Sequence, residues 1–409
     1  MSHRIELARP GAAPCRASLA FDDAIAILSN AANALGHESV ALGAAAGRRL
    51  AEPVVARIDG PRWDCAAMDG YAVRNRDLDA GLRRFASLGE IVAGDVAPTA
   101  VTRGSTMRVM TGAPLPEGAD RVVMIEYCAK IAGAVEIRAD PGSKPHVRRR
   151  GSDFTAGRTL LNKGRELTPV ALVAAAAGDV SHVTVWRRPR VHIVATGDEL
   201  VPPGEAAGRA DRIPDSLTAA IALLGNQWGG CVVRETRTGD DPDAIRDAFS
   251  TEDDVTVIIG GASRGDRDFG RSALVPVGLR LLFADVAIKP GKPSWYGKVG
   301  DAHVLGLPGN PTAALTVARL FLAPLLTGLG GGEPRSGLAW TYLPAAREVE
   351  AQGEREAFLV GDIVDGAALI FDRQESSAQN LLGQATILVR RPARAPRCAA
   401  GDTLPVLAI

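Results

Sequence analysis

The chain has 409 residues, of which 46% are hydrophobic and 23% charged, and its 47 basic residues balance 47 acidic ones. This length is too great for one hydrophobic core and predicts two to four domains. The zero formal net charge argues against a nucleic-acid partner, because such proteins carry a basic field.

The five cysteines are widely spaced and form neither a CxxC pair nor a Cys/His cluster. This distribution argues against a zinc site and a disulfide scaffold, and it favours a reducing compartment. The N-terminus lacks the apolar core of a signal peptide, and no apolar run approaches the roughly 20 residues that span a bilayer. We therefore expect a cytoplasmic protein with no membrane partner.

The N-terminal half is expected to hold two domains. Residues 18–35 predict a helix that Ser18 caps and that ends near Gly36, with apolar residues on one face. Short apolar runs between Gly and Pro indicate a β-rich module, a small barrel or sandwich, inserted at 61–144. It interrupts a helical or mixed domain. That N-terminal domain is expected to comprise residues 1–60 and 145–187.

The second half alternates strand-like and helix-like segments. Residues 188–327 therefore predict an α/β domain with a parallel sheet. Its buried strands are expected at three apolar runs, 191–195, 255–259 and 303–307. Its helices are expected at 214–224, 241–249 and 312–326. Residues 333–409 predict a small C-terminal β-barrel, so the fold class is multidomain α/β plus β.

Polar groups follow each of these three strands. The first strand leads into Glu199, the second into Gly260 and Gly261, and the third into Asn310. A fourth turn is stiffened by Pro and Gly and carries Lys289 and Lys292. Taken singly, each is better explained as an ordinary turn. Four together, at the edge where parallel strands end, predict a shared anion and metal site.

Seven segments extend this pattern along the chain: AAMDGYAV (66–73), VMTGAPLPEGAD (109–120), RRRGSDF (148–154), ATGDEL (195–200), GGASRGDRDF (260–269), IKPGKP (288–293) and GLPGNP (306–311). In this order they resemble the molybdopterin molybdenumtransferase family, which includes bacterial MoeA and the C-terminal domain of gephyrin. The resemblance covers nearly the whole chain, from about 18 to 390. It implies an elongated homodimer of four-domain subunits.

The resemblance also implies the chemistry. The family inserts molybdenum from molybdate into adenylyl-molybdopterin, with Mg²⁺, and releases AMP. By motif match, the carboxylates that would hold Mg²⁺ and act in catalysis are Glu199, Asp240 and Asp268. The family positions expected to reach the site across the dimer are Asp69, Thr111 and Asp153. The groups that would bind the cofactor substrate are Gly260, Gly261, Ser263, Gly265, Lys289, Lys292, Pro308, Gly309 and Asn310.

Several positions depart from the family pattern. They are Cys65-Ala66, Leu217, Asp285, Val360 and Gln379-Asn380. Because Val360 stands where an arginine is expected, a Val360→Arg substitution should tighten substrate binding. These departures raise the alternative of a divergent paralogue that binds or scaffolds without catalysis. Without the family, the residues alone would suggest a Mg²⁺-dependent phosphohydrolase. On its own, Asp69-Gly70 is better explained as a hairpin turn.

Overall fold

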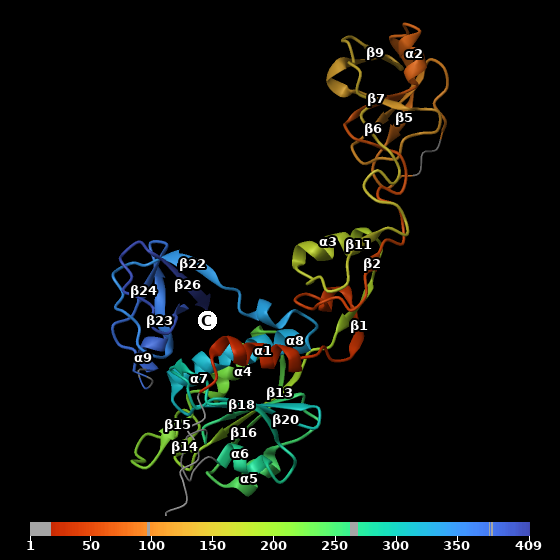
Figure 1. The fold of residues 1–409 in the computed structure, drawn as a ribbon. Helices are drawn as coiled ribbons and strands as arrows, with labels where there is room; N and C mark the ends of the chain where they lie inside the picture. Colours follow the sequence, from red (N-terminus) through yellow and green to blue (C-terminus); the bar gives the residue numbers. More distant parts are fainter. Residues whose placement is uncertain (1–17, 96–98, 262–268, 376, 378) are drawn as a thin grey trace, which may run out of the picture. The chain divides into compact units, whose positions relative to one another are not determined.

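The computed structural model describes residues 18–95, 99–261, 269–375, 377 and 379–409. The chain divides into two compact units (Figure 1). The larger unit comprises Met1–His37 and Trp186–Ile409, and the smaller unit comprises Glu38–Val185. Helix α1 (Phe21–Ala31) thus belongs to the larger unit, although residues 1–60 were expected to lie in one N-terminal domain. The other boundaries of the four-domain division remain a prediction.

A six-stranded mixed sheet forms the centre of the larger unit. Its strands, in spatial order, are β16 (Cys231–Thr238), β13 (Arg190–Thr196), β17 (Val255–Ile259), β21 (Ala302–Leu307), β20 (Trp295–Val299) and β18 (Arg280–Ala284). The first four are parallel, and the last two join antiparallel. β17 is buried along its whole length, as expected for a β-branched strand covered on both faces. The prediction of a wholly parallel sheet is therefore wrong at β20 and β18.

Helices cover both faces of this sheet (Figure 1). On one face, apolar residues of β13, β17 and β21 pack with α1, α4 (Thr218–Gln227), α7 (Pro311–Val317) and α8 (Ala323–Leu329). On the other face they pack with α5 (Pro242–Ala248) and α6 (Phe269–Leu274). The two apolar clusters make a three-layer α/β/α arrangement.

Helix α1 begins later than predicted, and its apolar face is buried within its own unit. Its N-cap is Ala20, which makes no side-chain capping bond, so Ser18 is not the cap. Phe21 packs against Phe321 and Phe358, with ring centroids 5.9 and 5.0 Å apart. Its apolar face is therefore not available to a second copy of the chain.

One helical stretch is long and apolar enough to cross a bilayer, which the sequence analysis missed. Pro311–Leu329 runs through α7, a π-helical segment (Ala318–Leu322) and α8, with a mean hydropathy of 1.6. In this structure 89% of the stretch is buried inside the protein, where it packs against α1 and the sheet. Among the described residues it is the one such helix.

The C-terminal part of the larger unit is a second sheet. Its strands are β19 (Ile288–Lys289), β23 (Glu356–Val364), β24 (Ala367–Ile370), β25 (Ile387–Arg391), β26 (Thr403–Ala408) and β22 (Thr341–Pro344). Pairing runs from β24 through β23, β25 and β26 to β22, and one isolated bridge between Ala345 and Ala368 links the two ends. The predicted barrel is thus not continuously paired. Short helices η4 (Pro334–Gly337) and α9 (Gln379–Leu382) flank the sheet.

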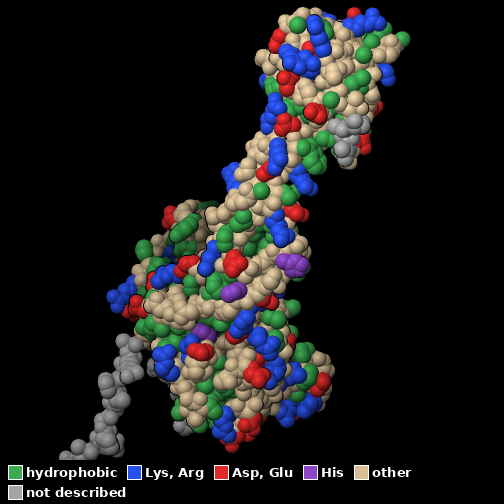
Figure 2. All heavy atoms as spheres, turned by 90° about the vertical axis from the view of Figure 1, so that its right-hand side faces the viewer, with side chains coloured by type: hydrophobic (Ala, Val, Ile, Leu, Met, Phe, Trp, Pro, Cys, Tyr) green, Lys and Arg blue, Asp and Glu red, His purple; other side chains and the backbone are tan. Residues whose placement is uncertain are grey.

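The smaller unit carries a six-stranded sheet of its own. In spatial order its strands are β7 (Arg121–Met124), β4 (Gly70–Val73), β6 (Ser105–Val109), β5 (Arg84–Ile91), β9 (Ala134–Ile137) and β8 (Cys128–Ile131). Successive residues of β4 belong to different apolar clusters on the two faces of the sheet: Ala72 to one and Val73 to the other. On the face shown in Figure 2, acidic and basic side chains are interspersed.

Shorter elements complete the smaller unit. Three two-stranded pairs are β1 (His37–Ala41) with β12 (His182–Trp186), β2 (Val54–Val55) with β11 (Thr159–Leu161), and β3 (Cys65–Ala66) with β10 (Val147–Arg148). Its helices are α2 (Asn75–Asp79) and α3 (Pro169–Ala177), with two short 3₁₀ segments, Leu42–Ala44 and Ile125–Tyr127. The Thr168 hydroxyl caps α3 by accepting from the Ala171 N–H at 3.2 Å, as its sequence predicted.

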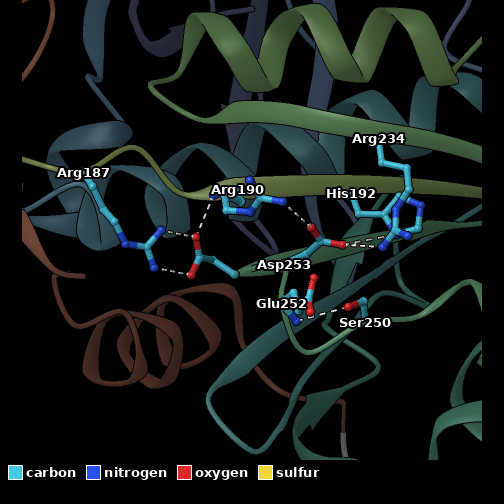
Figure 3. A network of polar contacts seen from close by, with 8 residues as sticks. Arg187, Arg190, His192, Arg234, Ser250, Glu252 and Asp253 are labelled. Carbon is cyan, nitrogen blue, oxygen red and sulfur yellow. Dashed lines mark hydrogen bonds and ion pairs between the residues drawn. The ribbon is translucent and has the colours of Figure 1, made fainter.

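A polar network fixes the amino ends of the parallel strands (Figure 3). Arg187 binds both carboxylate oxygens of Asp254 at 2.6 Å, and the Arg190 N–H donates to the same carboxylate at 2.7 Å. Asp253, which is 2% exposed, accepts from Arg234 at 2.6 Å. Because the two carboxylates lie just before β17 and their partners lie at β13 and β16, the network holds the starts of three strands together.

Candidate functional site

The carboxyl ends of the parallel strands lie level with one another. Thr196 at the end of β13 is opposite Thr238, while Ile259 at the end of β17 lies between Ala195 and Leu307. Beyond the strands, the Gly260 N–H donates to the Leu307 carbonyl at 3.0 Å. The loops that follow the strands therefore start from one sheet edge, as the sequence predicted.

Two glycines let these loops approach closely. Gly260 has φ +95°, and a Cβ there would lie 2.7 Å from the Thr196 carbonyl oxygen and 2.8 Å from its hydroxyl. A Cβ on Gly197 would lie 2.8 Å from a carboxylate oxygen of Glu199. The Glu199 side chain thus lies over Gly197, and the φ of +153° at Gly197 itself favours glycine.

The loops enclose a cavity of about 330 Å³, here called the strand-end cavity. Its lining residues are Thr196, Gly197, Glu199, Asp240, Gly260, Gly261, Pro293, Pro308, Gly309 and Asn310. The structure therefore brings two predicted carboxylates together with five predicted cofactor-binding residues. The Asp240 N–H donates to Asp198 at 3.1 Å, which ties the end of β16 to the loop after β13.

The carboxylates of Glu199 and Asp240 fit a hard divalent cation. Mg²⁺ takes oxygen ligands and is held in proteins by one or two carboxylates together with waters and substrate oxygens. No cluster of three or more His, Cys, Asp or Glu suited to a metal occurs in the described part of the chain. The third predicted metal ligand, Asp268, and the predicted cofactor-binding residues Ser263 and Gly265 lie outside the described residues.

Neither predicted lysine is among the residues that line this cavity. Lys289 is exposed at the end of β19, and Lys292 is half-buried next to Pro293, which does line the cavity. The turn between them passes close to α7, because a Cβ on Gly291 would lie 2.5 Å from Val317. Among the described residues, neither ammonium group has an ion-pair partner, so both can meet an anion.

A second cavity of about 550 Å³, here called the α4 cavity, adjoins the first and shares Thr196, Glu199, Gly309 and Asn310 with it. It also contains residues that the sequence analysis did not select, Asp215 and Ser216 before α4 and Ser377 from the C-terminal sheet region. The signal for Asp215 was present, since an Asp-Ser pair before a helix is a common N-terminal cap. It was instead included in a helix expected to begin at residue 214.

The C-terminal departures from the family pattern have unequal consequences. Gln379 lines the α4 cavity, so this region does contribute to a site wall. Val360 does not, because it is 4% exposed and packs in the main apolar core with Phe358 and Leu388. The expectation that Val360→Arg would tighten ligand binding is therefore wrong, since an arginine there would enter the core.

The remaining departures are also structural. Leu217 is buried in the core and borders the α4 cavity, and Cys65 and Ala66 are buried in β3. Asp285, which stands where the family often has lysine, has φ +58° and donates its N–H to the Ser294 carbonyl at 3.0 Å. It lies outside both cavity walls.

In the smaller unit, Asp69 and Thr111 form the pair that the motifs selected. The backbone N–H and the hydroxyl of Thr111 both donate to Asp69 Oδ1 at 2.7 Å. These two bonds, the backbone one first, lower the pKa of the exposed Asp69 carboxyl below its ordinary value of 3.8. Asp69 is thus kept as a carboxylate and not merely as a turn residue.

The third predicted residue of this unit, Asp153, is exposed. Its backbone N–H donates to the Gly60 carbonyl at 3.0 Å, and its carbonyl accepts from Arg158. Nearby, Arg149 pairs with Asp64 at 2.6 Å, and Arg150 pairs with Asp59 at 2.5 Å. Two of the three consecutive arginines are therefore engaged within the unit.

Comparisons with known proteins cover both units. Residues 19–178 match the model of the MoeA N-terminal region (domain I and II), and residues 192–328 match that of a probable molybdopterin binding domain. A molybdopterin molybdenumtransferase of Synechococcus elongatus is 33% identical over 373 residues, which is 88% of this chain and 91% of that protein. One from Haemophilus influenzae is 35% identical over 70% of this chain and 71% of its own length. A crystal structure of the molybdopterin biosynthesis MoeA protein from Pyrococcus horikosii matches 96% of this chain and 99% of its own, with a TM-score of 0.80 and 28% identity.

Proposed function

Since this chain belongs to the molybdopterin molybdenumtransferase family, we propose that it inserts molybdenum from molybdate into adenylyl-molybdopterin and releases AMP. The observation that carries the proposal is the strand-end cavity, in which Glu199 and Asp240 share one wall with the glycine turn of β17. The scaffold alternative gains nothing from the geometry, because the site carboxylates are retained and Ser377 and Gln379 still line a cavity.

Cleaving a phosphoanhydride requires that charge developing on the phosphates be neutralised. Lys292, next to the lining residue Pro293, would supply positive charge beside the strand-end cavity, and Lys289 lies on the same turn three positions earlier. Gly260 and Gly261 line the same cavity, and the Gly261 N–H would be the donor to a phosphate, because the Gly260 N–H already donates to the Leu307 carbonyl. The Pro308–Asn310 turn closes the same wall.

Glu199 and Asp240 would hold Mg²⁺, with Asp268 as a further predicted ligand. A bound Mg²⁺ supplies Lewis-acid stabilisation of the phosphate oxygens. The Glu199 carboxylate lies over Gly197 and lines the strand-end cavity, where it could meet a cation. Comparing AMP release with molybdate and with tungstate shows which of the two oxyanions the protein uses.

We further propose a cytoplasmic homodimer, in which Asp69, Thr111 and Asp153 complete the site of the partner. Helix α1 is not the contact, since its apolar face is buried. Helix α3 is the better candidate, because Val170 and Val173 on it are 81% and 68% exposed. A sedimentation measurement that finds only monomer at micromolar concentration contradicts this part of the proposal.

The function is tested by incubating the purified protein with adenylyl-molybdopterin and Mg²⁺, with molybdate or tungstate, while following AMP release. Glu199→Gln is expected to lower metal-dependent turnover by orders of magnitude while barely changing the melting temperature, because an exposed loop carboxylate contributes little to folding. The matched control is Glu205→Gln, another exposed glutamate after β14 (Leu200–Val201). Equal turnover in the two variants, or no AMP at saturating substrate, contradicts the proposal.

A further inference from the structure

The two carboxylate oxygens of Asp215 differ in their hydrogen bonding. Its Oδ1 accepts the N–H groups of Leu217 at 3.2 Å and Thr218 at 3.0 Å, which caps helix α4. Its Oδ2 is buried and has no hydrogen-bond partner among the described residues. Arg237 Nη1 lies 3.6 Å from this oxygen, which is ion-pair distance but too far for a hydrogen bond.

This unpartnered oxygen belongs to a residue that lines the α4 cavity and is only 5% exposed. A buried carboxylate oxygen without a donor is costly, and buried polar groups in native proteins are nearly always hydrogen-bonded. The backbone cap would be satisfied by one oxygen alone. The position of the other oxygen is therefore better explained by a donor that arrives with a ligand.

The rest of the cavity identifies the kind of ligand. Its walls combine apolar side chains with uncharged polar ones such as Ser216, Asn310 and Gln379, and its volume of about 550 Å³ lies in the usual range for a small-molecule site. None of its lining residues, all of them described, is Lys or Arg. A phosphate or an oxyanion would meet the carboxylates of Asp215 and Glu199 in this wall, whereas Arg237, 3.6 Å from Asp215 Oδ2, is not among the lining residues. A flat, uncharged heterocycle with N–H groups on its edge suits both the walls and the acceptor.

We propose that Asp215 is a specificity-determining residue that accepts a hydrogen bond from the amino edge of the pterin ring. This inference rests on the proposed function, which supplies a substrate with both a pterin and an adenine. The pterin is favoured because it presents an exocyclic amino group and a ring N–H side by side. The matched family model that includes Asp215 is, moreover, described as a molybdopterin binding domain. The anhydride would then extend from the α4 cavity into the adjoining strand-end cavity.

The test uses two fluorescent probes, 6-hydroxymethylpterin and 6-hydroxymethyllumazine, which carry an amino group and a carbonyl oxygen at the same ring position. The full-length protein should bind the pterin about 10- to 100-fold more tightly, the usual effect of one charge-assisted hydrogen bond. Asp215→Asn places an amide donor there while its oxygen can still cap α4. This variant should lose or reverse the preference, with a melting temperature close to that of the wild type.

The control is Asp211→Asn, an exposed aspartate just before β15 (Ile213–Pro214), which should keep the wild-type preference. With the complete substrate, Asp215→Asn should raise KM about 10- to 100-fold and change kcat little. A wild-type protein that binds both probes equally overturns the inference without any variant. So does an Asp215→Asn protein with an unchanged preference, or one that loses AMP affinity instead. Absence of AMP release from the wild type overturns the proposed function itself, whatever the probes show.

Discussion

Two buried histidines should make the stability of the larger unit depend on pH. His192 and His303 are 0% and 3% exposed, and burial is the main reason why the pKa of each falls from 6.5 to about 4. The positive charge of Arg234 adds to the effect at His192, and that of Lys298 adds to it at His303. Between pH 4 and pH 6.5 the unfolded chain therefore binds protons at these positions that the folded chain does not. Stability is fully present above pH 6.5 and falls as the pH falls through this window.

The size of the effect follows from the pKa difference. Each histidine should lower the free energy of unfolding by about 2 kcal/mol at pH 5, and by about 3 kcal/mol below pH 4. Together they remove about 4 kcal/mol at pH 5, a large part of the roughly 5–15 kcal/mol that stabilises a typical domain. Glutamine at either position removes the titration. It can also keep the hydrogen bond to Thr236 or to Tyr296.

Urea unfolding at pH 7.5 and at pH 5 measures this difference. The wild type should lose about 4 kcal/mol more between these conditions than the double variant His192→Gln, His303→Gln, because carboxylates that titrate in both proteins cancel. His37→Gln, at an exposed position of the same unit, is the matched control. If the double variant and the wild type show the same pH dependence, burial of the two imidazoles does not control stability and the reasoning fails.

Two further substitutions test the site and the core. Gly260→Ala should destabilise by more than about 2 kcal/mol and lower AMP release, because a Cβ there meets Thr196 at a strained φ; Gly300→Ala, at φ +58° with open space around it, should lose only the smaller strain energy. Val360→Arg should destabilise by more than about 3 kcal/mol, since it buries an unpaired cation, and it should not improve binding. Ile363→Arg on the same strand, at a position 47% exposed, should change stability by less than about 0.5 kcal/mol in the same urea assay. A mild effect of Val360→Arg would mean that this side chain can leave the core.

The sequence predicts the strand-end cavity well because that site depends on local rules. The run 255–259 is buried on both faces over the bounds predicted for it, and Glu199 and Gly260 follow their strands directly. The motifs selected Asp69 and Thr111 separately, and their contact was not predicted, since it joins residues 42 positions apart. Their catalytic roles stay predictions, because an arrangement of side chains does not measure turnover.

What the sequence did not predict depends on tertiary contacts. Asp215 was included in a helix because β15 is only two residues long and exists through its pairing with β14. Val360 was judged by its motif position, whereas the alternation of β23 directs it into the core. Likewise, the apolar face of α1 is compatible with an interface or a core. Only its packing against α8 and Phe358 decides between them.

The arginine–aspartate network at the amino ends of the strands has a consequence for the loops at their carboxyl ends. Asp254 is held by Arg187 and by the backbone of Arg190, so β17 cannot slip along β13 without breaking three hydrogen bonds. Strand register is thus supported at the edge of the sheet opposite the strand-end cavity. The loops at the other edge can accordingly be lengthened, shortened or exchanged without misaligning the strands that support them. The stretch between β13 and α4 is therefore a suitable place to insert a loop that recognises a different heterocycle. The strands that support such a loop would keep their alignment.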